Sequence, residues 1–228
     1  MSYSSLVNEM KKRSMNKTFV MNDKDIPGKI VTNNGTDLEV NYEYARKGCL
    51  GGMLTADAIL HELDSGHIKI DPFDKSMINP NSYNVRLHPE LKIYTGDVLD
   101  ARKYNKTKKL MIPEEGLILQ PGELYLGRTV ERTWTDDYIM EIDGRSSYGR
   151  LGMYVHVTAG FGDLGFDGTW TLEIQVIKPL KIYPYDEVAQ VCFFTKCGKG
   201  NVKYDGRYQG QVDATESRVQ MKKKEYKL

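Results

Sequence analysis

The amino-acid sequence predicts a mainly β fold, either a barrel or a sandwich, with few helices. Three observations indicate this fold: short β-like runs, 15 tyrosines in 228 residues, and frequent PG, TG, DG and PY pairs. Aromatic and β-branched residues favour strands, and glycine and proline pairs favour the turns between them. The predicted strand segments are residues 82–88, 91–96, 116–132, 138–144, 153–160, 168–184 and 187–194.

The chain divides into three predicted parts. Residues 1–52 are polar, are interrupted by NNGT and GCLGG, and lack sustained periodicity, which predicts an N-terminal extension with little core of its own. Residues 53–218 carry the strand pattern and form the predicted domain. Residues 219–228 form a basic tail, and residues 97–109 are predicted to be an exposed loop.

One helix is predicted at the start of the domain, over residues 56–65. Thr55 is its expected N-cap and Gly66 its stop. Its expected apolar face consists of Ile59, Leu60 and Leu63.

The predicted strand around Glu173 alternates strictly between apolar and polar residues. Trp170, Leu172, Ile174 and Val176 point one way, and Thr169, Thr171, Glu173 and Gln175 point the other. Periodicity alone is compatible with a solvated strand carboxylate. If the polar face instead lines a closed pocket, desolvation raises the pKa of Glu173, and the carboxylate can exchange protons with water and a leaving group.

A second candidate cluster lies in the GRSSYGR stretch. Ser146 is interpreted as the N-cap of a short helical turn that carries Ser147 and ends near Arg150, with Arg145 just before it. Backbone amides and a forked guanidinium suit phosphate oxygens. An ordinary capped turn with surface arginines is the alternative interpretation.

Two further polar residues have open interpretations. Asp163 lies in AGFGDLGFDG, where it either holds a tight bend as an Asx-turn or accepts a hydrogen bond from a sugar hydroxyl. His156 in YVHVT is interpreted as a packed strand histidine, with a catalytic role as the alternative. The sequence contains no phosphate-binding glycine loop and no GxSxG nucleophile motif.

Composition excludes several classes of protein. No apolar run approaches a membrane span, and the N-terminus lacks the apolar core of a signal peptide, so no membrane partner and a cytoplasmic location are predicted. A net charge of +1 argues against a polynucleotide partner bound by neutralising phosphates. The three cysteines, Cys49, Cys192 and Cys197, do not have the spacing of a zinc site.

The stretches that carry these residues resemble the dCTP deaminases of the trimeric dUTPase-like superfamily. The resemblance spans about residues 53–218 and rests on MLTADAILHELDSGHIKIDPFD, INPNSYNVRLH, GRSSYGRLGMYVHVTAGFGDLGFDGTWTLE and GRYQGQ. It implies a dUTPase-like distorted β-barrel that assembles as a homotrimer with active sites between neighbouring subunits. It also implies no zinc, and Mg²⁺ only with the nucleotide triphosphate.

The resemblance implies roles for residues that match the family's motifs. Glu173 is expected to deprotonate the water that attacks C4 of cytosine and then to protonate the departing amine. Ser146 and Arg150 are expected to shape the catalytic site and the phosphate pocket, and Arg145 and Ser147 share their motif.

The remaining expected contacts are with the nucleotide. Asp163 is expected to hold the deoxyribose 3′-hydroxyl, and the backbone at Thr171 and Leu172 to read the base. Gln211 belongs to a C-terminal segment that closes over the nucleotide. Arg207 stands where relatives usually have lysine, and Tyr204 is placed as a phosphate contact.

Asn84, Gly162 and Leu164 depart from the family's usual residues. The leading hypothesis for function is deamination of dCTP to dUTP and ammonia. A bifunctional deaminase that forms dUMP and diphosphate is the alternative. A dUTPase and a non-catalytic nucleotide-sensing module are the remaining hypotheses.

Overall fold

The computed structural model describes residues 52–156, 158–196, 198, 200 and 202–221, and the backbone of 32–33 and 37–38. The chain forms two compact units, residues 1–47 and 48–228. In the first unit, β1 (Thr32–Asn33) pairs antiparallel with β2 (Asp37–Leu38). Most of the predicted N-terminal extension and of the predicted basic tail lies outside the described residues.

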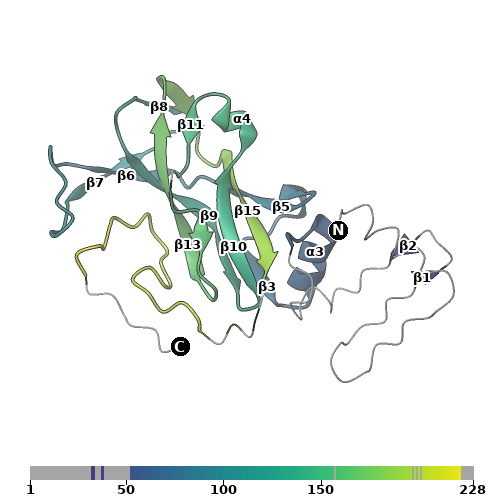
Figure 1. Ribbon diagram of the computed structural model, residues 1–228. Coiled ribbons are helices and arrows are strands. Elements are labelled where there is room, and N and C mark those ends of the chain that lie inside the picture. The colour runs from purple at the N-terminus through teal and green to yellow at the C-terminus, as the bar shows by residue number, and fades with distance from the viewer. Residues whose placement is uncertain are drawn as a thin grey trace, which may run out of the picture. The chain divides into compact units, whose positions relative to one another are not determined.

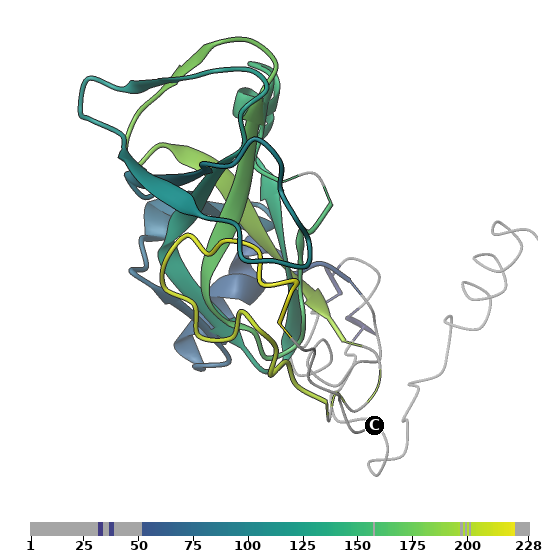
Figure 2. The same ribbon diagram turned by 90° about the vertical axis from the view of Figure 1, so that its left-hand side faces the viewer.

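The second unit consists of two main antiparallel sheets that face each other (Figure 1, Figure 2). In spatial order, the first sheet contains β12 (Phe161–Gly162), β10 (Tyr138–Gly144), β15 (Glu187–Thr195), β5 (Ser82–Arg86) and β4 (Ile78–Asn79). The second contains β11 (Met153–Tyr154), β13 (Asp167–Val176), β9 (Tyr125–Thr135), β6 (Glu90–Tyr94) and β7 (Thr107–Met111), with β3 (Ile68–Asp71) also paired to β9. A separate pair joins β14 (Leu180–Ile182) to β8 (Leu117–Leu119).

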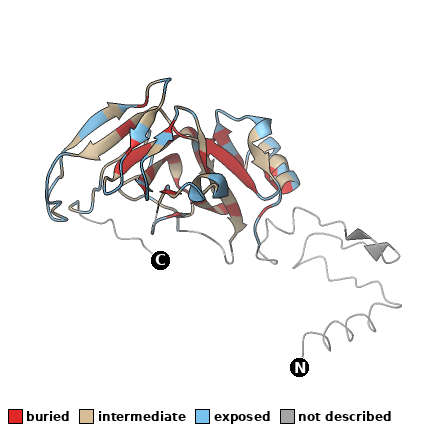
Figure 3. Cartoon of the chain, turned by 90° about the horizontal axis from the view of Figure 1, so that it is seen from above, coloured by how far each residue is buried: buried red, intermediate tan, exposed pale blue. Residues whose placement is uncertain are grey.

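The core lies between the two main sheets and is built from the inward-facing residues of their long strands (Figure 3). Tyr83, Val85, Leu172, Val191 and Phe193 are fully buried. Burying a side chain of this size stabilises a fold by about 1.5–3 kcal/mol relative to leaving it exposed. A bridge between Leu87 and Thr129 connects the two sheets where the chain passes from β5 toward β6. The predicted fold class, mainly β with a short helix near the start of the domain, is confirmed.

The predicted helix forms as α3 (Ala56–Asp64), and Gly66 follows it with a φ of 75°. Thr55 is the N-cap residue, but its hydroxyl bonds the Asp57 side chain and makes no capping bond to the helix backbone. The predicted apolar face is partly wrong, because Leu60 and Leu63 are only half-buried. The residues buried in α3 are Ala58, Ile59 and Glu62.

One predicted loop and one predicted strand also differ from the structure. The predicted loop over residues 97–109 ends early, because β7 begins at Thr107 and pairs with β6. The predicted strand over 153–160 contains only the two-residue β11. A short 3-10 helix, η1 (Lys75–Met77), precedes β4. None of the described helices is long and apolar enough to cross a bilayer.

Candidate functional site

Strand β13 carries the candidate catalytic residue Glu173. The predicted alternation is confirmed from Trp170 to Val176, since Trp170, Leu172, Ile174 and Val176 are all buried. Glu173 lies on the opposite face, half-buried, across from Leu126 of β9. Burial raises the pKa of the Glu173 carboxyl, and the charge of nearby His156 opposes that rise. The carboxyl is therefore partly shielded from water, and its pKa is not lowered by an ion pair with any described residue. An acid–base catalyst requires such an environment, in which the group can both take up and release a proton.

His156, which the sequence led us to interpret as a packed strand histidine, is a neighbour of Glu173. β11 pairs with β13 through Tyr154 and Gln175, and His156 follows two residues after Tyr154. Its side chain is 15% exposed, and Nε2 lies 3.8 Å from Oδ1 of Asp143. The neighbourhood of His156 and Glu173 follows from the antiparallel pairing of Met153 with Val176 and of Tyr154 with Gln175, which the sequence pattern alone does not reveal.

A cavity of about 150 Å³ lies beside His156. Its lining comes from the end of β10, the turn that follows and β11, and consists of Asp143, Gly144, Arg145, Ser146, Gly149, Met153, Tyr154, Val155 and His156. Gly160 packs against the imidazole, because a Cβ there would lie 2.8 Å from Cε1 of His156. The cavity thus brings the predicted serine and arginine motif next to the histidine that neighbours Glu173.

The serine and arginine motif forms the single-turn helix α4 (Ser146–Gly149). The predicted N-cap was wrong: Arg145 is the N-cap residue, and no side chain caps the helix. Ser146, Ser147 and Arg150 are all exposed.

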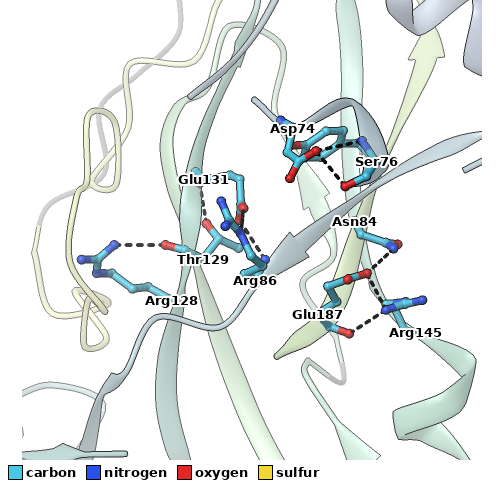
Figure 4. Close-up of polar contacts among 10 residues, drawn as sticks. Asp74, Ser76, Asn84, Arg86, Arg128, Thr129, Glu131, Arg145 and Glu187 are labelled. Atoms are coloured by element: carbon cyan, nitrogen blue, oxygen red, sulfur yellow. Dashed lines mark hydrogen bonds and ion pairs between the residues drawn. The ribbon is translucent and has the colours of Figure 1, made fainter. Parts of the chain in front are cut away.

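Arg145 is held by a polar network that joins three strands (Figure 4). Its Nη1 lies 2.7 Å from Oε2 of Glu187, and the same oxygen accepts a hydrogen bond from Asn84 Nδ2 at 2.6 Å. Asn84 in turn accepts one from Asn79 at 2.6 Å. An aspartate at position 84 would face Glu187 as a like charge, so the asparagine suits this chain's own network. The network fixes the start of α4.

The predicted C-terminal segment lies along the start of β13, as the yellow trace in Figure 1 shows. Gln211 makes three hydrogen bonds with Thr169. Its Nε2 donates to the Thr169 carbonyl at 2.8 Å, and its own carbonyl accepts from the Thr169 N–H at 2.9 Å and from the Thr169 hydroxyl at 3.4 Å. The N–H of Gly210 donates to the Asp167 carbonyl at 2.8 Å. These contacts bury Thr169, which strand alternation predicted to be on the polar face.

Tyr204, Arg207 and Asp163 gather near the same end of β13. The N–H of Tyr204 donates to the Leu164 carbonyl at 2.7 Å, which brings it beside the Asp163 turn. That turn is closed by the backbone bond from Phe166 N–H to the Asp163 carbonyl, and the Asp163 side chain is exposed. The carboxylate is thus available to a ligand, as the sugar-binding interpretation requires.

Trp170 explains one departure from the family's residues. A Cβ at position 162 would collide with the indole ring of Trp170, so this chain needs glycine there. The indole Nε1 donates to Thr133 Oγ1 at 2.8 Å, which fixes the ring in place.

Two side-chain atoms within residues 204–211 of the C-terminal segment carry unused hydrogen-bonding capacity. Nε of Arg207 and Oε1 of Gln211 are buried and have no hydrogen-bond partner within the described part of the chain. Buried polar atoms usually have a partner, so a polar ligand would satisfy both. In the described ranges, no group of three or more histidine, cysteine or acidic residues is arranged to hold a metal ion.

The predicted site residues therefore occupy three places along β13. Asp163, Tyr204, Arg207 and Gln211 lie near its start, and Thr171, Leu172 and Glu173 lie in the strand itself. Arg145, Ser146, Ser147 and Arg150 lie on or next to α4, which is linked to the end of β13 through β11.

Comparison with known proteins gives matches at the level of sequence and of fold. A family model described as dCTP deaminase-like matches residues 53–196. A protein from Hathewaya histolytica named dCTP deaminase, dUMP-forming, is 52% identical over 145 residues, which cover 64% of this chain and 84% of that protein. A protein of the same name from Leptospira biflexa serovar Patoc is 52% identical over 157 residues, covering 69% of this chain and 90% of the relative.

A solved structure supports the fold assignment. The 2'-deoxycytidine 5'-triphosphate deaminase from Agrobacterium tumefaciens superposes with a TM-score of 0.51 at 18% sequence identity. The match covers 64% of this chain and 49% of that chain, so this chain spans about half the length of that solved structure.

Proposed function

This chain belongs to the dCTP deaminase-like family, and we propose that it converts dCTP to dUMP, ammonia and diphosphate. The observation that carries the proposal is Glu173, a half-buried carboxyl with a raised pKa in a segment that matches the family. The sequence pattern led us to expect dUTP as the product. The relatives named dUMP-forming support the bifunctional alternative instead.

In the deamination step, Glu173 acts as the proton carrier. Its carboxylate takes one proton from water while the water oxygen bonds to C4 of cytosine and the π electrons of the C4=N3 double bond move to N3. The carboxyl then returns that proton to the amino group, the bond from C4 to the amino nitrogen breaks, and ammonia leaves. The remaining oxygen becomes the C4 carbonyl, and its proton passes to N3. Burial suits both half-steps, because a raised pKa makes the carboxylate a stronger base toward water and leaves the carboxyl able to return the proton to the amine.

In the second step, a water molecule attacks the α-phosphorus, and the bond to the β-phosphate oxygen breaks to give dUMP and diphosphate. Arg150 and Arg207 are the arginines that we assign to the triphosphate, since guanidinium groups bind phosphate oxygens in a forked geometry. Mg²⁺ would be held largely by phosphate oxygens and water, and would neutralise phosphate charge.

Assembly as a homotrimer is part of the proposal. Ser146, Ser147 and Arg150 are exposed, so a neighbouring subunit can reach them. Three large apolar side chains close to α4 are also exposed: Leu151, Tyr154 and Ile177, at 58%, 49% and 60%. We also propose that the enzyme is cytoplasmic and acts without a polynucleotide or membrane partner.

Incubation of the purified protein with dCTP, CTP, dCMP or dUTP in the presence of Mg²⁺, followed by chromatography, tests the proposal. We expect dCTP to give dUMP, diphosphate and ammonia in equal amounts. Stoichiometric accumulation of dUTP would favour the monofunctional deaminase. Turnover of dUTP without turnover of dCTP would indicate a dUTPase, and tight nucleotide binding without turnover would indicate a sensing module.

A further inference from the structure

The carboxylate of Glu216 connects the C-terminal segment to the hairpin formed by β6 and β7. Lys92 Nζ donates to its Oε2 at 3.1 Å, and the Tyr104 hydroxyl donates to its Oε1 at 3.0 Å. The following residue adds a third contact, from Ser217 N–H to the Tyr94 hydroxyl at 3.1 Å. We refer to the contacts of Lys92 and Tyr104 with Glu216 as the Glu216 clasp.

The Glu216 clasp differs from an ordinary surface ion pair. The side chains of Lys92 and Glu216 are only 15% and 20% exposed. Both oxygens of the carboxylate are occupied, each by a different donor. Exposed pairs contribute little because water screens them and the side chains lose freedom, and both effects are smaller for a pair shielded and oriented in this way.

The segment held by the clasp also contacts β13, the strand of Glu173. The N–H of Thr215 donates to the Thr171 hydroxyl at 3.1 Å, and Ala214 is buried. Four residues earlier, Gln211 is bonded to Thr169. The segment is therefore fixed at two points, on β13 and on the hairpin, and Figure 2 shows its yellow trace running across the strands.

The clasp persists at neutral pH. Burial by itself would raise the pKa of Glu216, but hydrogen bonds from its own backbone, from Lys92 and from Tyr104 outweigh that effect and lower the pKa. Glu216 is thus ionised throughout the physiological range.

We propose that Glu216 is a positioning residue, which seats the C-terminal segment on β13 through Lys92 and Tyr104 before a nucleotide arrives. The proposal rests on the function proposed above, in which Arg207 and Gln211 contact the nucleotide. A segment that is ordered in advance costs no ordering free energy on binding. Loss of the clasp transfers that cost to nucleotide binding, so it raises KM and leaves kcat nearly unchanged.

Three variants test the clasp: Glu216→Ala, Lys92→Ala and the charge exchange Lys92→Glu with Glu216→Lys. Glu115→Ala, in an exposed turn, is the matched control. Hydrogen exchange of the nucleotide-free protein should show faster exchange over residues 209–218 in both single variants. The charge exchange should restore protection, and the control should match the unchanged protein.

Steady-state kinetics with dCTP give the second measurement. We expect KM to rise about three- to thirtyfold in Glu216→Ala, the range typical of a lost interaction between paired side chains. kcat should change less than about twofold, and the charge exchange should recover most of the KM.

Two results would overturn the proposal: unchanged exchange over residues 209–218 in Glu216→Ala, or faster exchange with an unchanged KM. Failure of the proposed function looks different, because then the unchanged protein does not turn over dCTP at all. In that case the exchange measurement still decides whether Glu216 seats the segment.

Discussion

The hydroxyl of Thr129 accepts a hydrogen bond from the backbone N–H of Trp170 at 2.9 Å and donates one to the Glu131 carbonyl at 2.7 Å. The two contacts span a register shift between β9 and β13, where Thr169 pairs with Arg132 but Thr171 pairs with Arg128. At this irregularity, the Thr129 hydroxyl takes the place of a backbone carbonyl as the acceptor for the Trp170 N–H. The irregularity lies just before Thr171, Leu172 and Glu173. The Thr129 side chain fixes β13 at the register shift just before the candidate catalytic residue Glu173.

Replacing Thr129 by valine should destabilise the domain by about 1–3 kcal/mol, because the buried N–H of Trp170 loses its acceptor. Valine keeps the shape of threonine, so packing changes little. Chemical denaturation measures the free energy of unfolding. Thr95→Val, on an exposed part of the β6–β7 hairpin, is the control and should stay within about 0.5 kcal/mol. Equal losses in the two variants would contradict the role of Thr129.

Glu173→Gln should lower dCTP turnover by about 10²–10⁴-fold, because glutamine cannot carry the proton from water to the leaving amine. The side chain keeps its size, so the circular dichroism spectrum should be unchanged. Glu115→Gln, in an exposed turn, is the control and should retain full turnover. Normal turnover in Glu173→Gln would remove the catalytic assignment.

Glu173→Gln should also stabilise the folded protein, and the gain should depend on pH. The pKa of Glu173 is raised above its ordinary value of 4.5, so the folded state favours the protonated carboxyl. The stability that protonated Glu173 contributes is fully present below the pKa of this residue in the unfolded chain. It is lost as pH rises through the pKa of Glu173 in the folded protein. The difference in Tm between the variant and the unchanged protein should therefore be small near pH 4 and larger at pH 7.5. A difference that shrinks as pH rises would refute the raised pKa.

Mixing two inactive variants tests whether active sites are shared between subunits. We expect Arg150→Ala to bind dCTP weakly and to turn it over slowly, because the exposed guanidinium is assigned to the nucleotide. If Glu173 of one subunit acts with Arg150 of a neighbour, Glu173→Gln and Arg150→Ala subunits that are unfolded and refolded together should recover activity. The same variants refolded separately and then combined are the control. A mixed sample as inactive as that control would place both residues in one subunit's site.

The ion pair of Arg86 with Glu131 should contribute to the free energy of unfolding. Glu131 is fully buried, and it accepts hydrogen bonds from the Arg86 N–H at 2.8 Å and from Nε at 2.6 Å (Figure 4). Arg86→Met leaves this carboxylate without its cation and should cost about 3–5 kcal/mol by chemical denaturation. Lys103→Met breaks the exposed pair with Asp100 and should cost less than about 1 kcal/mol. Similar losses would show that burial does not distinguish the two pairs.

Prediction from the sequence was accurate where the signal is local. The alternation around Glu173 has a period of two residues, which a strand with one buried face imposes directly, and four of its apolar residues are buried. Helix α3 was also found, but its face was misassigned because Glu62 is buried, at 3.0 Å from His67. Local periodicity does not reveal a polar residue that is buried beside a partner.

The cap of α4 shows a second limit. Ser146 has the residue type of an N-cap, yet Arg145 occupies that position. The anchor of Arg145 is Glu187, 42 residues away in sequence, so no local rule identifies it. The strand in residues 107–111 was missed for a similar reason, since TKKLM lacks a clear apolar alternation and is a strand because of its pairing with β6.

The sequence by itself determined the fold class, the family and the position of the acidic residue that we assign to proton transfer, because strand periodicity and long motifs are properties of neighbouring residues. Only the tertiary structure decided that His156 lies beside Glu173, that Glu187 holds Arg145, and that Glu216 ties the C-terminal segment to Lys92. Each of these contacts joins residues far apart along the chain. Their formation depends on strand register and on burial, which are properties of the assembled sheets.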